Sequence, residues 1–117
     1  MSASKSKGTR WESAIVEYLR ASGVPHAERR ALNGTKDRGD VAGIPGVVIE
    51  AKNAATVSLG AWLDEAEAER VNDGAAVAVV WHHRRGKRSP ASGYVTMSGA
   101  TLVELLVAAG YIRRDTA

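Results

Sequence analysis

The spacing of hydrophobic and polar residues changes several times along the chain, and each spacing predicts either a helix or a strand. Three segments carry apolar residues at intervals of three or four, which is the spacing of one face of a helix. The first of them opens with Thr9-Arg-Trp-Glu12, the pattern of a capping box at a helix N-terminus. Helices are therefore predicted over residues 9–21, 58–71 and 98–110, the last of them beginning at Ser98 or Thr101.

Short apolar runs bounded by turn residues separate these helices and predict strands. The run over residues 75–82 is continuous, so both of its faces are expected to be buried. Gly43-Ile-Pro-Gly46 is a turn signal that joins two of the other strands into a hairpin. Strands are predicted over residues 24–31, 38–43, 47–52, 75–82 and 93–97. The order α-β-β-β-α-β-β-α predicts an α/β fold in which helices flank a central mixed β-sheet.

The composition fits one soluble domain. Of the 117 residues, 44% are apolar and 25% are charged, and no apolar run approaches the ~18 residues of a membrane span. The chain has no cysteine, which excludes disulfides and thiolate metal sites and suits a reducing cytoplasm. The N-terminal segment lacks the apolar stretch of a secretory signal. We expect a flexible basic arm at residues 1–8, a single domain at 9–112 and a tail at 113–117.

Basic residues gather in loops and at the ends of the predicted elements. The net charge is +3, which is a mild preference for polyanionic partners. Clustered lysine and arginine side chains can contact phosphates, although each cluster could equally serve only to keep the surface soluble. The candidate nucleic-acid contacts are Lys5, Lys7, Arg10, Arg29, Arg30, Lys36, Arg38, Arg84, Arg85, Lys87 and Arg88.

The strand predicted over residues 47–52 carries unexpected charges. Alternation puts Glu50 and Lys52 on one of its faces. If the hairpin is centred on Pro45, paired positions sum to 90 and Asp40 lies opposite Glu50. Opposed Cβ atoms are ~4.5–5.5 Å apart, so two carboxylates there repel one another unless a cation compensates them. Mg²⁺ is the obvious candidate, because it binds one or two carboxylates and takes further ligands from water and substrate phosphates.

Lys52 adds a positive charge to the same face of this strand. Beside a metal-bound phosphate, its ammonium group could orient or activate an attacking water. A surface ion pair between Glu50 and Lys52 is the alternative interpretation. That pair would explain the glutamate and the lysine, but it leaves the opposed aspartate unexplained.

Glu12 is a further candidate, because it lies within the apolar stripe of the first predicted helix. Its carboxylate could point at the edge of the sheet or could simply complete the capping box, and the pattern leaves both interpretations open. The acids of the second predicted helix are expected to be solvated, although one of them could reach Lys52. These acids include Glu65, Glu67 and Glu69. The histidines have no metal-ligand spacing, which favours structural or surface roles for His26, His82 and His83.

The set formed by Glu12, Gly39-Asp40 and Glu50-Ala51-Lys52 resembles the PD-(D/E)XK nuclease superfamily. More narrowly, the sequence is similar to the archaeal and phage Holliday junction resolvases of that superfamily, over roughly residues 5–97. The segments that carry this narrower resemblance are Lys7-Gly8-Thr-Arg-Trp-Glu12, Gly39-Asp-Val and Val48-Ile-Glu-Ala-Lys52. The chain departs from the family at Gly39, where the family has a proline.

The resemblance implies a restriction-endonuclease-like core and a metal-dependent DNA endonuclease. Asp40, Glu50 and the backbone carbonyl of Ala51 would bind Mg²⁺, for which Mn²⁺ could substitute, and Glu12 would complete the site directly or through water. Lys52 would orient or activate the nucleophilic water. The family's resolvases are homodimers that cut four-way DNA junctions in recombination and repair, which implies a bacterial, archaeal or phage-infected cytoplasm.

Two alternatives to a junction resolvase stay open. The first is a repair or restriction-type nuclease of the same fold that acts on linear duplex DNA. The second is a non-catalytic nucleic-acid-binding domain that keeps the fold, although the joint presence of Asp40, Glu50 and Lys52 counts against it. The superfamily hosts many nucleases, so the chemistry is better specified than the shape of the DNA.

Overall fold

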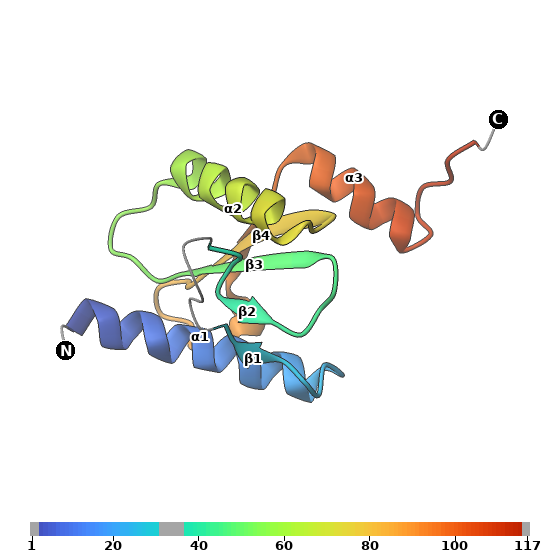
Figure 1. Ribbon diagram of the computed structural model, residues 1–117. Helices are drawn as coiled ribbons and strands as arrows, with labels where there is room; N and C mark the ends of the chain where they lie inside the picture. Colours follow the sequence, from blue (N-terminus) through green and yellow to red (C-terminus); the bar gives the residue numbers. More distant parts are fainter. Residues whose placement is uncertain (1–2, 31–36, 116–117) are drawn as a thin grey trace.

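The computed structural model describes residues 3–30 and 37–115, without the side chain of Ser4 (Figure 1). Within these residues the predicted order of helices and strands is confirmed, with one short 3₁₀ helix added before the last strand. None of the described helices is long and apolar enough to cross a membrane. The elements are α1 (Ala3–Ala21), β1 (Glu28–Arg29), β2 (Val41–Ala42), β3 (Val47–Lys52), α2 (Leu59–Asp73), β4 (Val77–His82), η1 (Pro90–Ser92), β5 (Tyr94–Thr96) and α3 (Gly99–Ala108).

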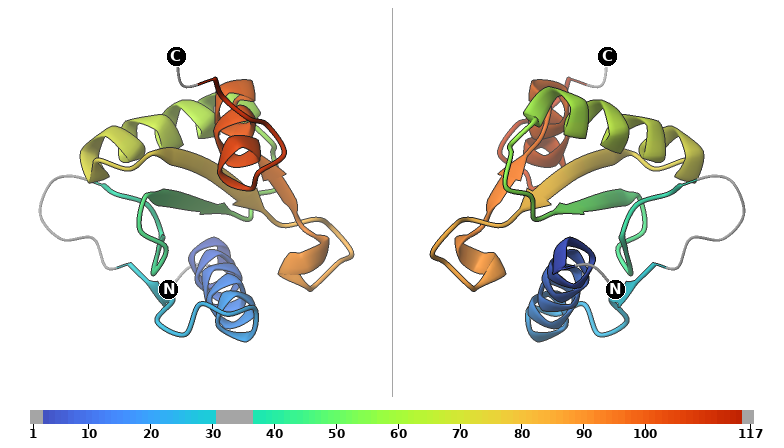
Figure 2. Two further views of the ribbon diagram at one scale, coloured as in Figure 1. Left: turned by 90° about the vertical axis from the view of Figure 1, so that its right-hand side faces the viewer. Right: turned by 90° about the vertical axis from the view of Figure 1, so that its left-hand side faces the viewer.

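The five strands form one mixed sheet in the order β1-β2-β3-β4-β5. β3 and β4 are parallel, and every other neighbouring pair is antiparallel. The parallel pair requires a crossover connection, which α2 provides. α1 lies against one face of the sheet, whereas α2 and α3 lie on the other (Figure 1, Figure 2). The chain is therefore an α/β protein whose mixed sheet is flanked by helices, as the sequence predicted.

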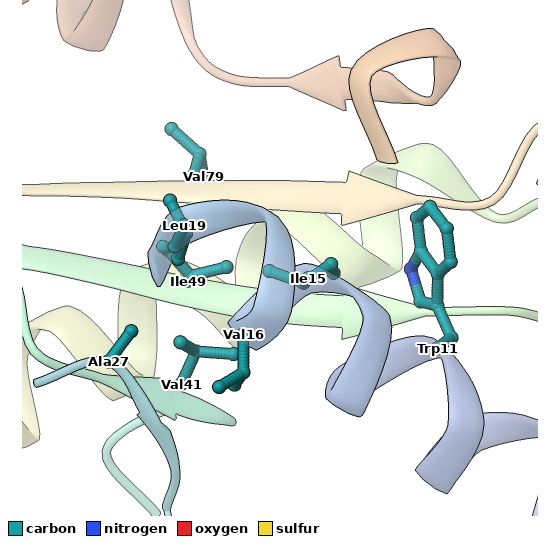
Figure 3. Close-up of a cluster of buried hydrophobic side chains, with 8 residues drawn as sticks. All are labelled: Trp11, Ile15, Val16, Leu19, Ala27, Val41, Ile49 and Val79. Carbon is teal, nitrogen blue, oxygen red and sulfur yellow. The ribbon is translucent and has the colours of Figure 1, made fainter. Parts of the chain in front are cut away.

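The face of the sheet toward α1 carries the larger apolar core (Figure 3). α1 contributes one side of this core through residues spaced by three or four positions, and Ile15 is completely buried at its centre. The indole nitrogen of Trp11 donates a hydrogen bond to the carbonyl oxygen of Trp81 at 3.0 Å, which fixes α1 against the end of β4. The buried members are Trp11, Ile15, Val16, Leu19, Ala27, Val41, Ile49 and Val79.

The face toward α2 has a smaller core built largely from alanine and valine. Small side chains let α2 approach the sheet closely, and Trp62 is the one large residue among the buried members described. α2 ends at Gly74, whose left-handed φ of 67° closes the helix as the sequence Asn72-Asp-Gly74 indicated. The buried members are Val48, Trp62, Ala66, Ala75, Ala78 and Val80.

The hairpin between β2 and β3 has the predicted register. Val41 pairs with Ile49, so the paired positions sum to 90. The amide of Asp40 also donates to the carbonyl oxygen of Ile49, at 2.9 Å, so the backbone of Asp40 bonds one residue short of its expected partner Glu50. β3 itself covers the predicted residues 47–52.

Three boundaries differ from the prediction. α1 begins at Ala3, so residues 3–8 are helical and do not form the expected flexible arm, and Thr9-Arg-Trp-Glu12 lies inside the helix. Gly8, which costs about 1 kcal/mol in a helix interior, does not stop it. The strands predicted over 24–31 and 38–43 shrink to the two-residue β1 and β2. At the last helix the structure selects Ser98, whose hydroxyl accepts the amide of Thr101 at 3.0 Å.

Candidate metal centre

Glu50 lies on the α2 side of β3 and is 4% exposed. Burial raises the pKa of Glu50 to about 12, and the neighbouring carboxyl groups of Glu69 and Asp40 add to the shift. Its Oε2 atom is buried, and no hydrogen-bond donor of the described residues reaches it. A carboxyl group with an unused oxygen in this position is held neutral by a proton unless a cation takes the place of that proton.

Asp40 is fixed by the backbone of the strand opposite. Its Oδ2 atom accepts the amide of Ala51 at 2.8 Å, and its carbonyl oxygen accepts the amide of Arg30 at 2.8 Å. Gly39 makes this geometry available: its φ is 99°, and a Cβ there would lie 2.9 Å from Val48 Cγ1. A proline, whose φ is held at about −65°, could not adopt this conformation. The departure from the family pattern is therefore required by the backbone before Asp40.

Lys52 bridges two of the acidic side chains. Its Nζ atom lies 3.0 Å from Glu65 Oε2 and 3.7 Å from Glu50 Oε1. Burial lowers the pKa of Lys52, but the hydrogen bond to Glu65 and the charges of the surrounding carboxylates outweigh it, so the net shift is upward. In this arrangement Lys52 is a fixed positive charge suited to orienting a ligand, and it is unsuited to accepting a proton.

Glu12 points toward the same edge of the sheet from α1. Burial raises the pKa of its carboxyl group, and the charge of Asp40 raises it further, against the opposing effect of Arg29. The Arg29 Nε atom donates to Glu12 Oε1 at 3.2 Å. Because α1 begins six residues before Thr9, Glu12 does not serve as the N-terminal cap of the helix. The capping interpretation of Glu12 is therefore wrong; its carboxylate pairs with Arg29 and is influenced by the charge of Asp40.

The burial of Glu69 on α2 was not predicted, whereas the possibility that one acid of this helix reaches Lys52 is confirmed by Glu65. Glu69, expected to be solvated, is 2% exposed and belongs to the buried face of the helix. Glu65 reaches Lys52, whereas Glu67 pairs with Arg70 at 2.7 Å along the same helix. The spacing carried a signal, since Glu69 follows Trp62 by seven positions and Ala66 by three, which places all three on one face.

Four carboxylates meet between α2 and the hairpin. One oxygen from each lies within 4.8 Å of the others, and the four residues are Asp37, Glu50, Glu65 and Glu69. Burial raises the pKa of Glu69 to about 7; its contact with Glu50 lowers it, and the charges of Asp37, Glu65 and Asp40 raise it. Together with the unused oxygen of Glu50, this set of hard oxygen donors could hold a metal ion.

A cavity of about 820 Å³ lies immediately beyond Lys52, at the carboxyl ends of the parallel strands β3 and β4. Its described lining includes the basic side chains of Lys7, Arg84 and Arg85 and contains no acidic residue. The Arg84 guanidinium lies 5.5 Å from the centre of the Tyr94 ring, which is half exposed. The cavity is thus a positively charged recess with an aromatic wall, next to a negatively charged cluster.

The other basic candidates are divided among different surroundings. Arg29 pairs with Glu12, while Arg30 and Arg38 lie 3.1 and 4.0 Å from Asp73. Lys36 lies outside the described residues, and Lys5 has an interaction of its own. Exposed positions are occupied by Arg10, Lys87 and Arg88. The predicted set therefore does not form one surface, and its clearest grouping is the one at the cavity.

Comparison with known proteins does not place the chain in a family. No family model matches it, and no curated protein or solved structure is significantly similar to it. The candidate metal centre is therefore defined by the chemistry of its own residues and by the motif that they resemble.

Proposed function

We propose that the protein is a Mg²⁺-dependent endonuclease that hydrolyses phosphodiester bonds in branched DNA, with a four-way junction as the best candidate substrate. One observation carries the proposal: the hairpin brings the charge of Asp40 close to Glu50, and Lys52 lies on the same face of β3, 3.7 Å from Glu50. This combination of two carboxylates and a lysine is the one whose spacing resembles PD-(D/E)XK nucleases.

The residues present fit a divalent cation. Glu50 has a buried oxygen that no donor of the described residues reaches, and the Oδ2 atom of Asp40 is held in place by the amide of Ala51. We assign Asp40, Glu50 and the Ala51 carbonyl as ligands of Mg²⁺ or Mn²⁺, with Glu12 completing the site directly or through water. When bound, the cation would act as a Lewis acid toward a phosphate oxygen and would acidify a coordinated water.

The protein's own residues have separate tasks in the proposed reaction. Lys52, held protonated by Glu50 and Glu65, orients the water and offsets the charge that develops on the phosphate. The water oxygen bonds to phosphorus as the bond to the 3′ oxygen breaks, which leaves a 5′-phosphate and a 3′-hydroxyl. One proton of the water passes to solvent, and the departing 3′ oxygen takes one up.

The cavity beyond Lys52 supports a nucleic-acid substrate. Phosphates would meet Lys7, Arg84 and Arg85, and an unstacked base would find the ring of Tyr94. Branched DNA supplies unstacked nucleotides at its crossing point, whereas uninterrupted duplex does not. This favours a branched substrate over linear duplex for the same chemistry.

The proposal includes a homodimer, which the resemblance implies. Exposed apolar side chains on β5 and α3 offer a surface that a second copy could cover. The members of this surface are Val95, Leu102 and Val103.

Cleavage of labelled DNA tests the proposal. Purified protein with Mg²⁺ or Mn²⁺ should nick a synthetic four-way junction faster than linear duplex. Asp40→Asn should reduce this rate by more than about 100-fold, beyond the 10–100-fold typical of residues that only support a metal ligand. Asp64→Asn is the matched control, since Asp64 is exposed on α2 and lies outside the four-carboxylate cluster. Intact junctions, flaps and duplex with both metals would refute the proposal, and equal rates on junction and duplex would favour the linear-duplex nuclease.

A further inference from the structure

Glu69 is the most unusual buried group among the described residues. It is 2% exposed, and no hydrogen-bond donor of the described residues reaches either of its carboxylate oxygens. Burial of a charged carboxylate without a partner is strongly unfavourable, and in most proteins such a group is paired or coordinates a metal. A helix does not need a glutamate on its buried face for packing, because Trp62 and Ala66 already supply that contact.

The neighbours of Glu69 increase the negative charge. Its oxygens lie with those of Asp37, Glu50 and Glu65 in one cluster, within 4.8 Å of one another. Among the described residues, Lys52 is the amine that contacts this cluster, through ion pairs with Glu50 and Glu65. Within the described part of the chain, one ammonium group therefore stands against four carboxylates. That group, on Lys52, forms no ion pair with Glu69.

We propose that Glu69 completes a second divalent-cation site, formed with Asp37, Glu50 and Glu65 and separate from the Asp40 side of the centre. Glu50 belongs to both sites. The inference therefore rests on the proposed function for the first site, which Glu50 forms with Asp40. The ligands are carboxylate oxygens only, which selects a hard cation such as Mg²⁺, Mn²⁺ or Ca²⁺.

The spacing of the oxygens agrees with a cation of this size. Ligands on opposite sides of an ion are about 4.2 Å apart around Mg²⁺ and about 4.6–5.2 Å apart around Ca²⁺. The four oxygens all lie within 4.8 Å of one another, which is inside the span for Ca²⁺ and somewhat wider than the span for Mg²⁺.

The cluster combines a buried base with an open entrance. Glu50 and Glu69 form the base, whereas Asp37 and Glu65 are exposed and leave an approach from solvent. Asp37 is already held in place, since its Oδ1 atom accepts the amide of Gly39 at 3.0 Å and its carbonyl oxygen accepts the Asn72 side chain at 2.9 Å. Ordering the site thus requires little rearrangement of the backbone.

Counting bound Mn²⁺ without DNA tests the inference. Electron paramagnetic resonance of free Mn²⁺ would be followed during titration of the full chain and of four variants. The Asp40→Asn variant should still bind Mn²⁺ at the second site. The Glu69→Gln variant should bind Mn²⁺ at that site more than tenfold more weakly. Glu67→Gln is the matched control, because Glu67 lies on the same helix but outside the cluster. Circular dichroism would verify the fold, and Glu65→Gln, at the exposed entrance, repeats the test without changing the interior.

The outcomes separate this inference from the nuclease proposal. A loss of affinity in Glu69→Gln that is less than tenfold relative to Glu67→Gln would overturn the second site and would mean that Glu50 and Glu69 merely share a proton. Because no DNA is present, the Mn²⁺ result stands even if four-way junctions are not cut. Conversely, a cut junction with unchanged Mn²⁺ binding in Glu69→Gln would leave the nuclease standing and remove the second site.

Discussion

Ile49 and Glu50 are neighbours on β3, yet their side chains face opposite sides of the sheet and meet very different surroundings. Ile49 enters the apolar core beneath α1, together with Ile15 and Val41. Glu50 lies beneath α2, where the apolar cluster around Trp62 gives way to buried carboxyl groups. The α1 face therefore carries the larger apolar core, while the α2 face also accepts an electrostatic penalty that a bound cation or proton removes.

The largest expected effect is on the α1 face. Ile15→Ala should lower the free energy of unfolding by about 2–5 kcal/mol, because it opens a cavity at a fully buried position. Urea denaturation followed by circular dichroism measures this loss. Leu102→Ala, at a position 47% exposed, is the control and should change stability far less. Equal losses in the two variants would mean that the α1 face is not the main source of stability.

The opposite pattern is expected at Glu50. Glu50→Gln should reduce cleavage of a four-way junction by more than about 100-fold, which is about 2.7 kcal/mol in the barrier, because it removes a metal-binding charge. Stability without metal should stay within about 1 kcal/mol of wild type, since the amide resembles the protonated carboxyl that burial favours. Cleavage rate and melting temperature, measured on one preparation, test both statements. A large loss of stability in Glu50→Gln would contradict the assignment of Glu50 to the metal site and of stability mainly to the α1 face.

The smallest expected effect, per pH unit, is on the stability of the metal-free protein, and it arises on the α2 face. The pKa of Glu69 is raised from its ordinary 4.5 to about 7, so the metal-free native state binds more protons than the unfolded chain in that interval. Stability is then fully present below about pH 4.5 and falls as the pH rises to about 7, by at most about 1.4 kcal/mol per pH unit for one proton. The raised pKa of Glu50 acts in the same direction.

Melting temperatures between pH 4.5 and 8 in EDTA would measure this slope. Glu69→Gln should flatten it, because its amide does not titrate. Glu67→Gln, whose exposed carboxylate pairs with Arg70, should keep the wild-type slope. A wild-type protein that becomes more stable across this interval would contradict the assignment of Glu69 as a buried acid.

The sequence predicted those features that follow from strictly local rules. The period of two along β3 and the turn around Pro45 predicted the pairing of Val41 with Ile49, whereas the backbone of Asp40 bonds to Ile49 and not to the expected Glu50. The order of elements followed from apolar periodicity and turn residues. Glu12 could not be decided from sequence, because its role depends on where α1 begins, and Ala3 was not a recognisable start.

The burial of Glu69 was hard to predict, because the spacing of apolar residues in α2 indicates the buried face of this helix only weakly. Acidic side chains occur on several sides of this helix, and its apolar residues do not form one continuous stripe. Its rotation about its own axis is decided by the contact of Trp62 and Ala66 with Val48 and the strands beside it. That contact is tertiary, and so is the approach of Asp37 from the other side of the hairpin.

The hydrogen bond between Trp11 and Trp81 has a consequence for the order in which the chain folds. It joins residues 70 positions apart, so the loop between them must close before the bond can form. During synthesis, α1 leaves the ribosome before β4, so Trp11 meets this partner only after β4 has followed. The Trp11 end of α1 therefore docks late, when most of the sheet has been made.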